Sequence, residues 1–280
     1  MNVIYKILET LLPFQWVQYE FMKNAFVAIL IITPLFGLLG TMIVNNRMAF
    51  FSEALGHSAF TGIAIGVIFG IVDTSLSMIT FAVVFALLLN KIKRMNTIST
   101  DTIISVFASF STAVGLVILS KGGNFSKYSS LLVGDILSIT AKEIIFLLII
   151  FVVAIVFWFF TFNKLHTLSV NRSLAKSRGV RVVLIDNLFV VLIAVIVMLS
   201  IKWVGILIIN ALLILPAAAS RNLADDMREY HLFSILISVF SGILGLILSY
   251  YNNTATGPTI VIVAAVVFFA TLVARPFIKH

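Results

Sequence analysis

Cysteine is absent from the 280 residues of this chain, and charged residues make up only 11% of it. Without cysteine there is neither a disulfide framework nor a thiolate ligand, which excludes the softest class of metal site. Soluble globular domains carry charge on roughly a quarter of their residues, so the scarcity of charge argues against a soluble protein. A phosphate-cradling glycine loop is also missing from the sequence, and we therefore expect no nucleotide hydrolysis by this chain itself.

Hydrophobic residues account for 61% of the chain, and its mean hydropathy is +1.16. They occur in long runs, most of them near the roughly 20 residues that a helix needs to cross a bilayer. We predict an all-α, polytopic helical membrane bundle with about 8–9 transmembrane helices, organised as one transmembrane domain over residues 1–280. Pro34 and the short run 75–90 leave open whether some runs are broken or re-entrant. The runs cover residues 25–44, 50–72, 75–90, 101–120, 141–162, 183–201, 203–218, 232–250 and 259–277.

The N-terminal segment is of a different kind. It lacks a basic stretch followed by a cleavable apolar segment, so we expect no signal peptide to be removed. Residues 1–22 are instead predicted to form an interfacial segment, with apolar residues on one side, a break at Pro13 and Trp16 near its end.

The net charge is +8, and the basic residues lie in short segments between the apolar runs. Basic residues that flank membrane spans mark the cytoplasmic side, which explains the charge without a nucleic acid as partner. If each run crosses the membrane once, the basic clusters share the cytoplasmic side, while the N-terminus and the loops 121–130 and 251–258 lie outside. The clusters are Lys91, Lys93 and Arg94; Lys164, Arg172, Lys176, Arg178 and Arg181; and Arg275 and Lys279.

One apolar run contains an acid and an imidazole. Between Phe50 and Val72, Glu53 is the only residue with a formal charge, and His57 follows it four positions later, on the same face of a helix. Ionisable groups inside the membrane usually face the bundle interior or an aqueous path. A carboxylate oxygen beside an imidazole nitrogen suits a divalent transition metal. The pair therefore predicts a metal site on a transport path.

The alternative for this pair is an internal hydrogen bond between Glu53 and His57 that helps to pack a polar bundle. Two protein ligands are too few for a closed structural zinc site, which takes about four. A metal would therefore bind weakly here or share ligands with other helices, as transport requires, because the ion must also leave.

Other polar residues are candidates for additional ligands, above all Asp101 and Asn210, and then Asp135. Each has a structural alternative: Asp101 as a favourable charge at a helix N-terminus, Asp135 as a turn residue after glycine, and Asn210 as an interhelical hydrogen-bond partner. Three further histidines are predicted to be solvated, namely His166, His231 and His280.

Small residues recur at every fourth position of the run that contains Glu53, and we predict that Gly62, Gly66 and Gly70 allow close helix packing. Near the C-terminal third, an apolar run passes Pro216 and is followed by the charged stretch 219–230. This stretch is predicted to form a short helix on the cytoplasmic surface that docks in a groove of a partner, with an ordinary charged loop as the alternative.

Several segments together resemble the membrane permeases of the zinc/manganese/iron class of bacterial ABC importers. The resemblance covers nearly the whole length, and its separated blocks follow the order of the family. At Glu53, members of the class more often carry aspartate, which has the same charge and one methylene less. The segments are Gly37–Thr41, Arg47–Phe50, Glu53–His57, Gly62–Gly66, Gly134–Leu137 and Val204–Arg221 with its ending Pro-Ala-Ala-Ala-Ser-Arg.

The resemblance implies a homodimer, or a close-paired dimer, with a translocation path along the subunit interface. It also implies a cytoplasmic ATPase on the inner face and an extracytoplasmic metal-binding protein that delivers the ion. Glu53 and His57 would then line the metal path, and residues 219–230 would be the coupling helix that transmits closure of the ATPase. The residues that we expect in this coupling are Pro216, Arg221, Asp225, Asp226 and Arg228.

We therefore expect a transport subunit of the bacterial cytoplasmic membrane, not an enzyme, that imports a divalent metal and holds no permanent cofactor. Zn²⁺ is favoured over Mn²⁺ because the imidazole of His57 suits zinc. The rival is a proton-coupled secondary transporter of a metal or small solute, in which His57 titrates near neutral pH with Glu53 as its partner. A membrane scaffold or sensor is a third class, and an intramembrane protease lacks the further ligands that its site needs.

Overall fold

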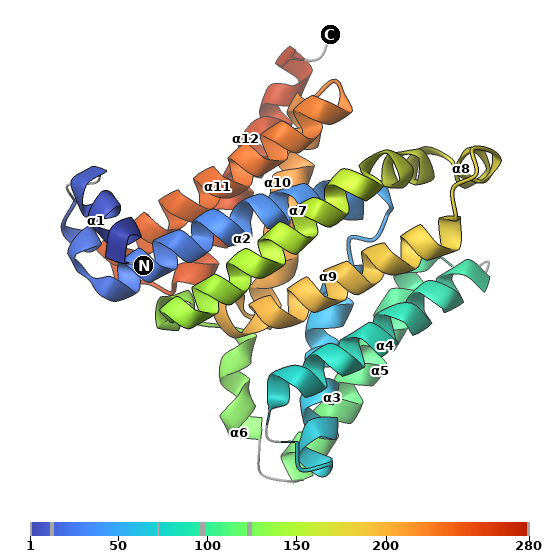
Figure 1. Cartoon of the computed structure of the whole chain (residues 1–280), viewed down its shortest axis with the longest axis horizontal. Coiled ribbons are helices and arrows are strands. Elements are labelled where there is room, and N and C mark those ends of the chain that lie inside the picture. The colour runs from blue at the N-terminus through green and yellow to red at the C-terminus, as the bar shows by residue number, and fades with distance from the viewer. Residues whose placement is uncertain (1, 12–13, 72, 96–98, 122–124, 279–280) are drawn as a thin grey trace. The chain divides into compact units, whose positions relative to one another are not determined.

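The computed structural model describes residues 2–11, 14–71, 73–95, 99–121 and 125–278 (Figure 1). In these ranges every regular element is helical, and eight helices are long and apolar enough to cross a membrane, with α10 as a shorter apolar helix. This confirms the predicted polytopic helical bundle. The elements are α1 (Asn2–Leu11), η1 (Gln15–Gln18), α2 (Glu20–Asn45), α3 (Phe51–Ile68), α4 (Thr74–Met95), α5 (Thr100–Lys121), α6 (Phe125–Tyr128), η2 (Ser129–Leu132), η3 (Ile136–Ser138), α7 (Ala141–Val170), α8 (Arg172–Ser177), α9 (Val182–Val204), α10 (Ile206–Leu223), α11 (Met227–Asn252) and α12 (Thr256–Ile278).

The run that contains Pro34 and the short run 75–90, which the sequence left open as broken or re-entrant, each form one continuous helix. Helix α2 continues through Pro34 without interruption, and α4 extends beyond the predicted 75–90 to Met95. Proline is tolerated within membrane helices because neighbouring groups satisfy the carbonyl that it leaves without a donor.

The chain forms two compact units. Unit 1 contains residues 1–41, 133–155 and 211–280, and unit 2 contains residues 42–132 and 156–210. Helices α2, α7 and α10 each supply residues to both units.

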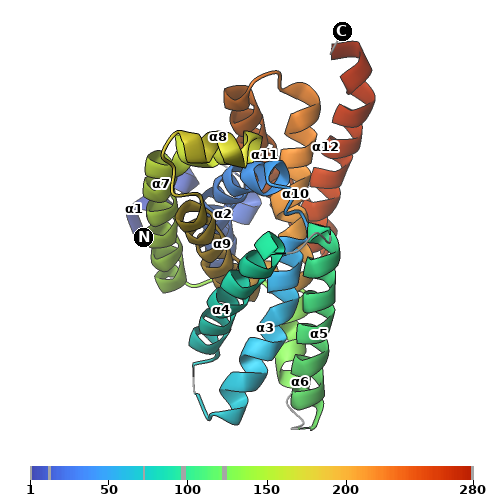
Figure 2. The same cartoon turned by 90° about the vertical axis from the view of Figure 1, so that its right-hand side faces the viewer.

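Helix α3 is the central element of unit 2 and packs against α4, α5 and α9. Figure 2 shows α3 between α4 and α5. The approach to α4 is close because α3 presents glycines there: a Cβ atom on Gly62 would lie 2.9 Å from the Cα of Met78, and one on Gly66 would lie 2.6 Å from the Oγ of Ser77. Small residues that let backbones approach take the place of a hydrophobic driving force between helices in lipid.

Gly70 does not belong to this contact. Helix α3 ends at Ile68, Gly70 has a φ of +66°, and apart from its chain neighbours no residue lies within 4 Å of the position where its Cβ would be. The N–H of Ile71 donates to the carbonyl of Gly66, which is typical of a helix that ends in a left-handed glycine. The prediction of a packing role for Gly70 is therefore wrong, because the helix ends before the apolar run does.

In unit 1, α11 packs against α2 and α12. The hydroxyl of Ser234 on α11 donates to the carbonyl of Gly37 on α2, at 2.7 Å. A Cβ atom on Gly245 would lie 2.5 Å from the Cα of Ile260 on α12, so the two backbones are in direct contact. Hydroxyl-to-carbonyl bonds and glycines thus fix this unit as well.

The N-terminal segment is held against α2 of the same unit. Trp16 in η1 is only 2% exposed, and its ring centroid lies 5.5 Å from that of Phe26. The Nζ of Lys23, which is itself 7% exposed, lies 2.6 Å from the Oε1 of Glu9 on α1. The location of residues 1–22 at the membrane surface stays a prediction, and Pro13 lies outside the described residues.

The sequence predicts one short helix over residues 219–230, but the structure divides this stretch between two helices. Helix α10 continues to Leu223, the chain bends at 224–226, and α11 begins at Met227. The carboxylate of Asp226 accepts hydrogen bonds from the N–H groups of Arg228 and Glu229, at 2.7 and 2.9 Å. Such a side-chain cap starts a new helix, which explains why the predicted helix is divided.

Candidate metal centre

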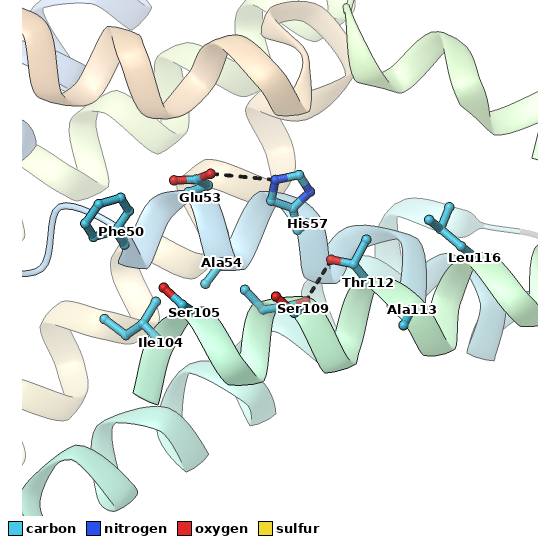
Figure 3. Close-up of a pocket in the computed structure, with 11 residues that line it drawn as sticks. Phe50, Glu53, Ala54, His57, Ile104, Ser105, Ser109, Thr112, Ala113 and Leu116 are labelled. Atoms are coloured by element: carbon cyan, nitrogen blue, oxygen red, sulfur yellow. Dashed lines mark hydrogen bonds and ion pairs between the residues drawn. The ribbon is translucent and has the colours of Figure 1, made fainter. Parts of the chain in front are cut away.

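Glu53 and His57 project from one side of α3, one turn apart (Figure 3). The Nε2 of His57 lies 3.9 Å from the Oε1 of Glu53. This distance is too long for a hydrogen bond, so the structural alternative of a direct Glu–His hydrogen bond is not present. Two metal–ligand bonds of roughly 2.0–2.2 Å can bridge such a gap.

Both side chains line a cavity of about 480 Å³ between α3 and α5, and Figure 3 shows the two walls. The side chain of Glu53 is 43% exposed and that of His57 is 30% exposed, so both are accessible in the single chain. The cavity is lined by Phe50, Glu53, Ala54, His57, Ile104, Ser105, Ala108, Ser109, Thr112, Ala113 and Leu116.

The α5 wall of the cavity carries three hydroxyl side chains among apolar ones. Ser105, Ser109 and Thr112 line the cavity, and they lie along one side of the helix at the spacing of successive turns. The residues predicted for the site do not include this row, although its helical spacing is visible in the sequence. A carboxylate and an imidazole opposite a row of hydroxyls offer oxygen and nitrogen ligands in a space that water can enter.

The α3 and α5 walls are joined one turn beyond His57. The hydroxyl of Thr61 donates to the carbonyl of Ser111, and the hydroxyl of Ser111 lies 3.0 Å from that of Thr61. A Cβ atom on Gly115 would lie 2.5 Å from the backbone nitrogen of Thr61, so the helices touch through their backbones at this level.

Asn210 is the predicted additional residue that the structure brings to the pair. Its Nδ2 lies 3.5 Å from the Oε2 of Glu53, and its Oδ1 accepts a hydrogen bond of 2.5 Å from the hydroxyl of Ser52. This confirms the interhelical hydrogen bond predicted for Asn210, here between α10 and α3. Ser52 is not among the predicted residues, because a serine beside an acid carries no signal in the sequence.

The other two predicted carboxylates lie elsewhere. Asp101 is exposed in the first turn of α5, as its structural alternative requires, and is not among the residues that line the cavity. Asp135 follows Gly134, which has a φ of +67°, and accepts a hydrogen bond from the N–H of Leu137 at the start of η3. Within the described part of the chain, no group of three or more histidines and acids is placed to hold a metal ion.

His231 and His166 are less exposed than the sequence prediction of solvated histidines implies. His231 is only 8% exposed in the first turns of α11, and its Nδ1 lies 2.5 Å from the carbonyl oxygen of Met227. The prediction of a solvated His231 is therefore wrong, because α11 turns this side chain into the unit. His166 is partly buried and stacks on Phe162, and His280 lies outside the described residues.

The predicted coupling residues form an exposed charged bend in unit 1. Arg221, Asp225, Asp226 and Arg228 are exposed, whereas Pro216 is buried within α10. The N–H groups of Glu229 and Arg228 donate to the carboxylate of Asp226 and lower its pKa. Asp226 is therefore charged near neutral pH and holds the start of α11.

Membrane-length apolar helices, with an accessible acid–imidazole pair in a cavity between α3 and α5, are typical of a membrane transport protein. Residues 18–275 match the ABC 3 transport family, and the chain belongs to this family. It is a multi-pass permease of the bacterial inner membrane, from the metal-ion class of ABC importers, and a transport subunit, not an enzyme.

The names of the relatives refer to two different metals, zinc and manganese. The chain is 31% identical over 242 residues to the high-affinity zinc uptake system membrane protein ZnuB of Buchnera aphidicola, a match that covers 85% of this chain and 92% of the relative. It is 28% identical over 259 residues to the manganese import system permease protein ScaB of Streptococcus parasanguinis, and this match covers 92% of each. The fold is similar to that of PsaBC from Streptococcus pneumoniae in complex with Fab, with a TM-score of 0.78 and 24% identity over 97% of this chain and 95% of that chain.

Proposed function

We propose that this chain, with a second copy, forms the path of an ATP-driven importer of divalent metal, with Zn²⁺ favoured and Mn²⁺ next. Glu53 and His57 are the transient metal site. The observation that carries this proposal is the exposure of both side chains to one cavity at a separation of 3.9 Å, which a single ion can bridge.

The single chain offers too few ligands for a stable site. Zinc takes about four ligands, and the described residues supply the pair Glu53 and His57 without a third histidine or acid beside them. A second copy related by two-fold symmetry would supply the same pair again, since a symmetric interface presents identical residues from both subunits. We therefore propose a homodimer in which two acids and two imidazoles meet on the path.

The ligand set supports zinc over manganese only modestly. Imidazole nitrogen suits zinc, whereas carboxylate and hydroxyl oxygens suit manganese, and this cavity has both kinds of group. The named relatives include a zinc and a manganese system. Zinc is our first choice because His57 is one of the two strongest ligands present.

Energy for transport comes from a separate cytoplasmic ATPase in this proposal, and an extracytoplasmic metal-binding protein delivers the ion. The charges of the bend between α10 and α11 are the proposed contact with the ATPase, namely Arg221, Asp225, Asp226 and Arg228. A rigid, charged projection between two helices fits a groove on a partner protein. Pro216 lies between one and two turns before this contact.

The test is metal uptake by His57→Ala and Glu53→Gln variants of the complete importer, measured with radioactive zinc and manganese. We expect both variants to lose most of the uptake of the physiological metal. His166→Ala and Glu143→Gln are matched controls, because both lie outside the cavity and should transport normally. Wild-type uptake in both site variants would contradict the proposal.

The same assay separates the ATP-driven importer from a proton-coupled carrier. We expect the chain to co-purify with a nucleotide-binding subunit, and uptake to stop without ATP and to persist when the proton gradient is collapsed. Uptake that follows the proton gradient and needs no ATP would instead support the secondary transporter.

A further inference from the structure

We propose that Asn210 is a positioning residue of the metal site, which holds the Glu53 carboxylate through a hydrogen bond and does not itself bind the metal. This inference rests on the proposed function, because it assigns a role to the neighbour of the proposed transport site. It also replaces the expectation that Asn210 is an additional ligand.

The two oxygens of Glu53 face different partners. Oε1 is directed to His57, whose Nε2 lies 3.9 Å away, and Oε2 lies 3.5 Å from the Nδ2 of Asn210. The Asn210 amide therefore donates to Oε2, the carboxylate oxygen that is not directed to the imidazole. This leaves Oε1, on the side of His57, as the oxygen available to an ion.

Ser52 fixes the direction in which the Asn210 amide points. The hydroxyl of Ser52 donates to the Oδ1 of Asn210 at 2.5 Å, which turns the NH₂ group towards Glu53. The reverse orientation would place Oδ1, an acceptor, against a carboxylate oxygen, which is also an acceptor. An amide held in this way presents N–H groups to the site, and these donate hydrogen bonds but do not ligate metals.

Helices α3 and α10 pack against each other around this contact. Ser52 is fully buried on α3, and one turn later a Cβ atom on Gly56 would lie 3.3 Å from the Cγ2 of Ile206 on α10. Ile206 and Asn210 are one turn apart on α10, just as Ser52 and Gly56 are on α3. The close contact of the helices and the hydrogen-bonded chain Ser52–Asn210–Glu53 are thus parts of one interface.

Groups that orient a metal ligand from behind contribute strongly to metal binding, and their loss typically costs about 10–100-fold in affinity or activity. We expect Asn210→Leu, which keeps the approximate volume but removes the donor, to raise the KM for metal uptake about tenfold. The maximal rate at saturating metal should change much less, because the ligands themselves remain.

Ser52→Ala separates the positioning role from ligation. If Asn210 positions Glu53, loss of the hydroxyl frees the amide to rotate, and the KM should rise about threefold or more. If Asn210 were a ligand, the same change would release its Oδ1 for the metal, and the KM would fall or stay constant. Ser58→Ala is the matched control: Ser58 is also fully buried on α3, and its hydroxyl donates within the helix, to the carbonyl of Leu55.

The measurement is the KM and maximal rate of zinc and manganese uptake in proteoliposomes that contain the complete importer, together with the melting temperature of each variant. A raised KM in Asn210→Leu and Ser52→Ala, with Ser58→Ala unchanged, supports the inference. A lower melting temperature without a change in KM would show a packing role and overturn it, as would a wild-type KM in either variant.

The Glu53→Gln variant distinguishes this inference from the proposed function. If Glu53→Gln transports normally, the proposed metal site itself is wrong. If Glu53→Gln loses uptake while Asn210→Leu keeps the wild-type KM, only the role assigned to Asn210 is wrong.

Discussion

Gly115 on α5 lies directly against the backbone of Thr61 on α3. A Cβ atom at Gly115 would be 2.5 Å from the Thr61 nitrogen and 2.6 Å from the carbonyl carbon of Phe60. The Thr61 hydroxyl donates to the carbonyl of Ser111 one turn earlier on α5. This contact therefore sets the distance between the two helices that carry the cavity walls.

Gly115→Ala should consequently destabilise unit 2, because backbone atoms, which cannot rotate away, would have to move. Overpacking of this kind costs typically about 1–3 kcal/mol. Thermal unfolding of the detergent-solubilised protein measures the effect. Gly56→Ala is the graded control, since its nearest contact is a side-chain methyl group at 3.3 Å, and it should lose less. Equal melting temperatures for Gly115→Ala and the wild type would show that the α3–α5 contact yields to an added methyl group.

His57→Asp should change which metal is preferred. The substitution replaces a nitrogen ligand by an oxygen ligand, and oxygen ligands favour manganese over zinc. We expect the ratio of zinc to manganese uptake to fall, measured by competition between the two ions at equal concentration. His166→Asp, outside the cavity, should leave the ratio unchanged. An unchanged ratio in His57→Asp would remove the imidazole from metal selection.

The start of α11 should depend on pH through Asp226. Hydrogen bonds from the backbone N–H groups of Glu229 and Arg228 lower the pKa of this carboxyl below its ordinary value of 3.8. A lowered pKa in the folded state stabilises the fold above the ordinary pKa, and this stabilisation is lost as the pH falls through the folded-state pKa. In Asp226→Asn, which keeps a capping oxygen but does not titrate, the loss of melting temperature on acidification below pH 3.8 should be smaller than in the wild type. The same loss in both proteins would exclude this carboxyl as the cause.

The ion pair between Arg172 and Asp186 should stabilise the contact of α8 with α9. Asp186 is 2% exposed, and its Oδ2 lies 2.8 Å from the Nη2 of Arg172. Arg172→Ala leaves a buried carboxylate without this cation, and we expect a loss of about 1–3 kcal/mol, moderated by the partial exposure of the arginine. Arg178→Ala, an exposed arginine of the same segment, should have little effect. The double variant Arg172→Leu/Asp186→Leu should regain stability, because a buried pair can be replaced by apolar residues.

The sequence predicts the membrane spans and the acid–imidazole pair well, and for physical reasons. A bilayer requires helices of a minimum apolar length, so the runs appear directly in the hydropathy of the chain. The side-chain period of a helix is by itself enough to place Glu53 and His57 on one face. Both predictions depend only on local sequence.

The predictions that fail depend on helix ends or on tertiary contacts. Gly70 belongs to the regular row of small residues, but the apolar run continues past the point where α3 ends. The stretch 219–230 is divided because the cap formed by Asp226 competes with continuation of α10, and composition does not decide that competition. The contact of Asn210 with Glu53 joins residues 157 positions apart, which no local pattern reveals.

The hydroxyls of Ser105, Ser109 and Thr112 follow one another along α5 at intervals of about one turn, or roughly 5 Å. An ion can cross a membrane quickly only if each stop on its way is favourable enough to reach and weak enough to abandon. In the importer proposed here, a cation that leaves the Glu53 carboxylate would meet the hydroxyl oxygens of α5 along its path. Release from Glu53 and His57, the stronger ligands, would then limit the rate of transport, and the weakly binding hydroxyls of α5 would not.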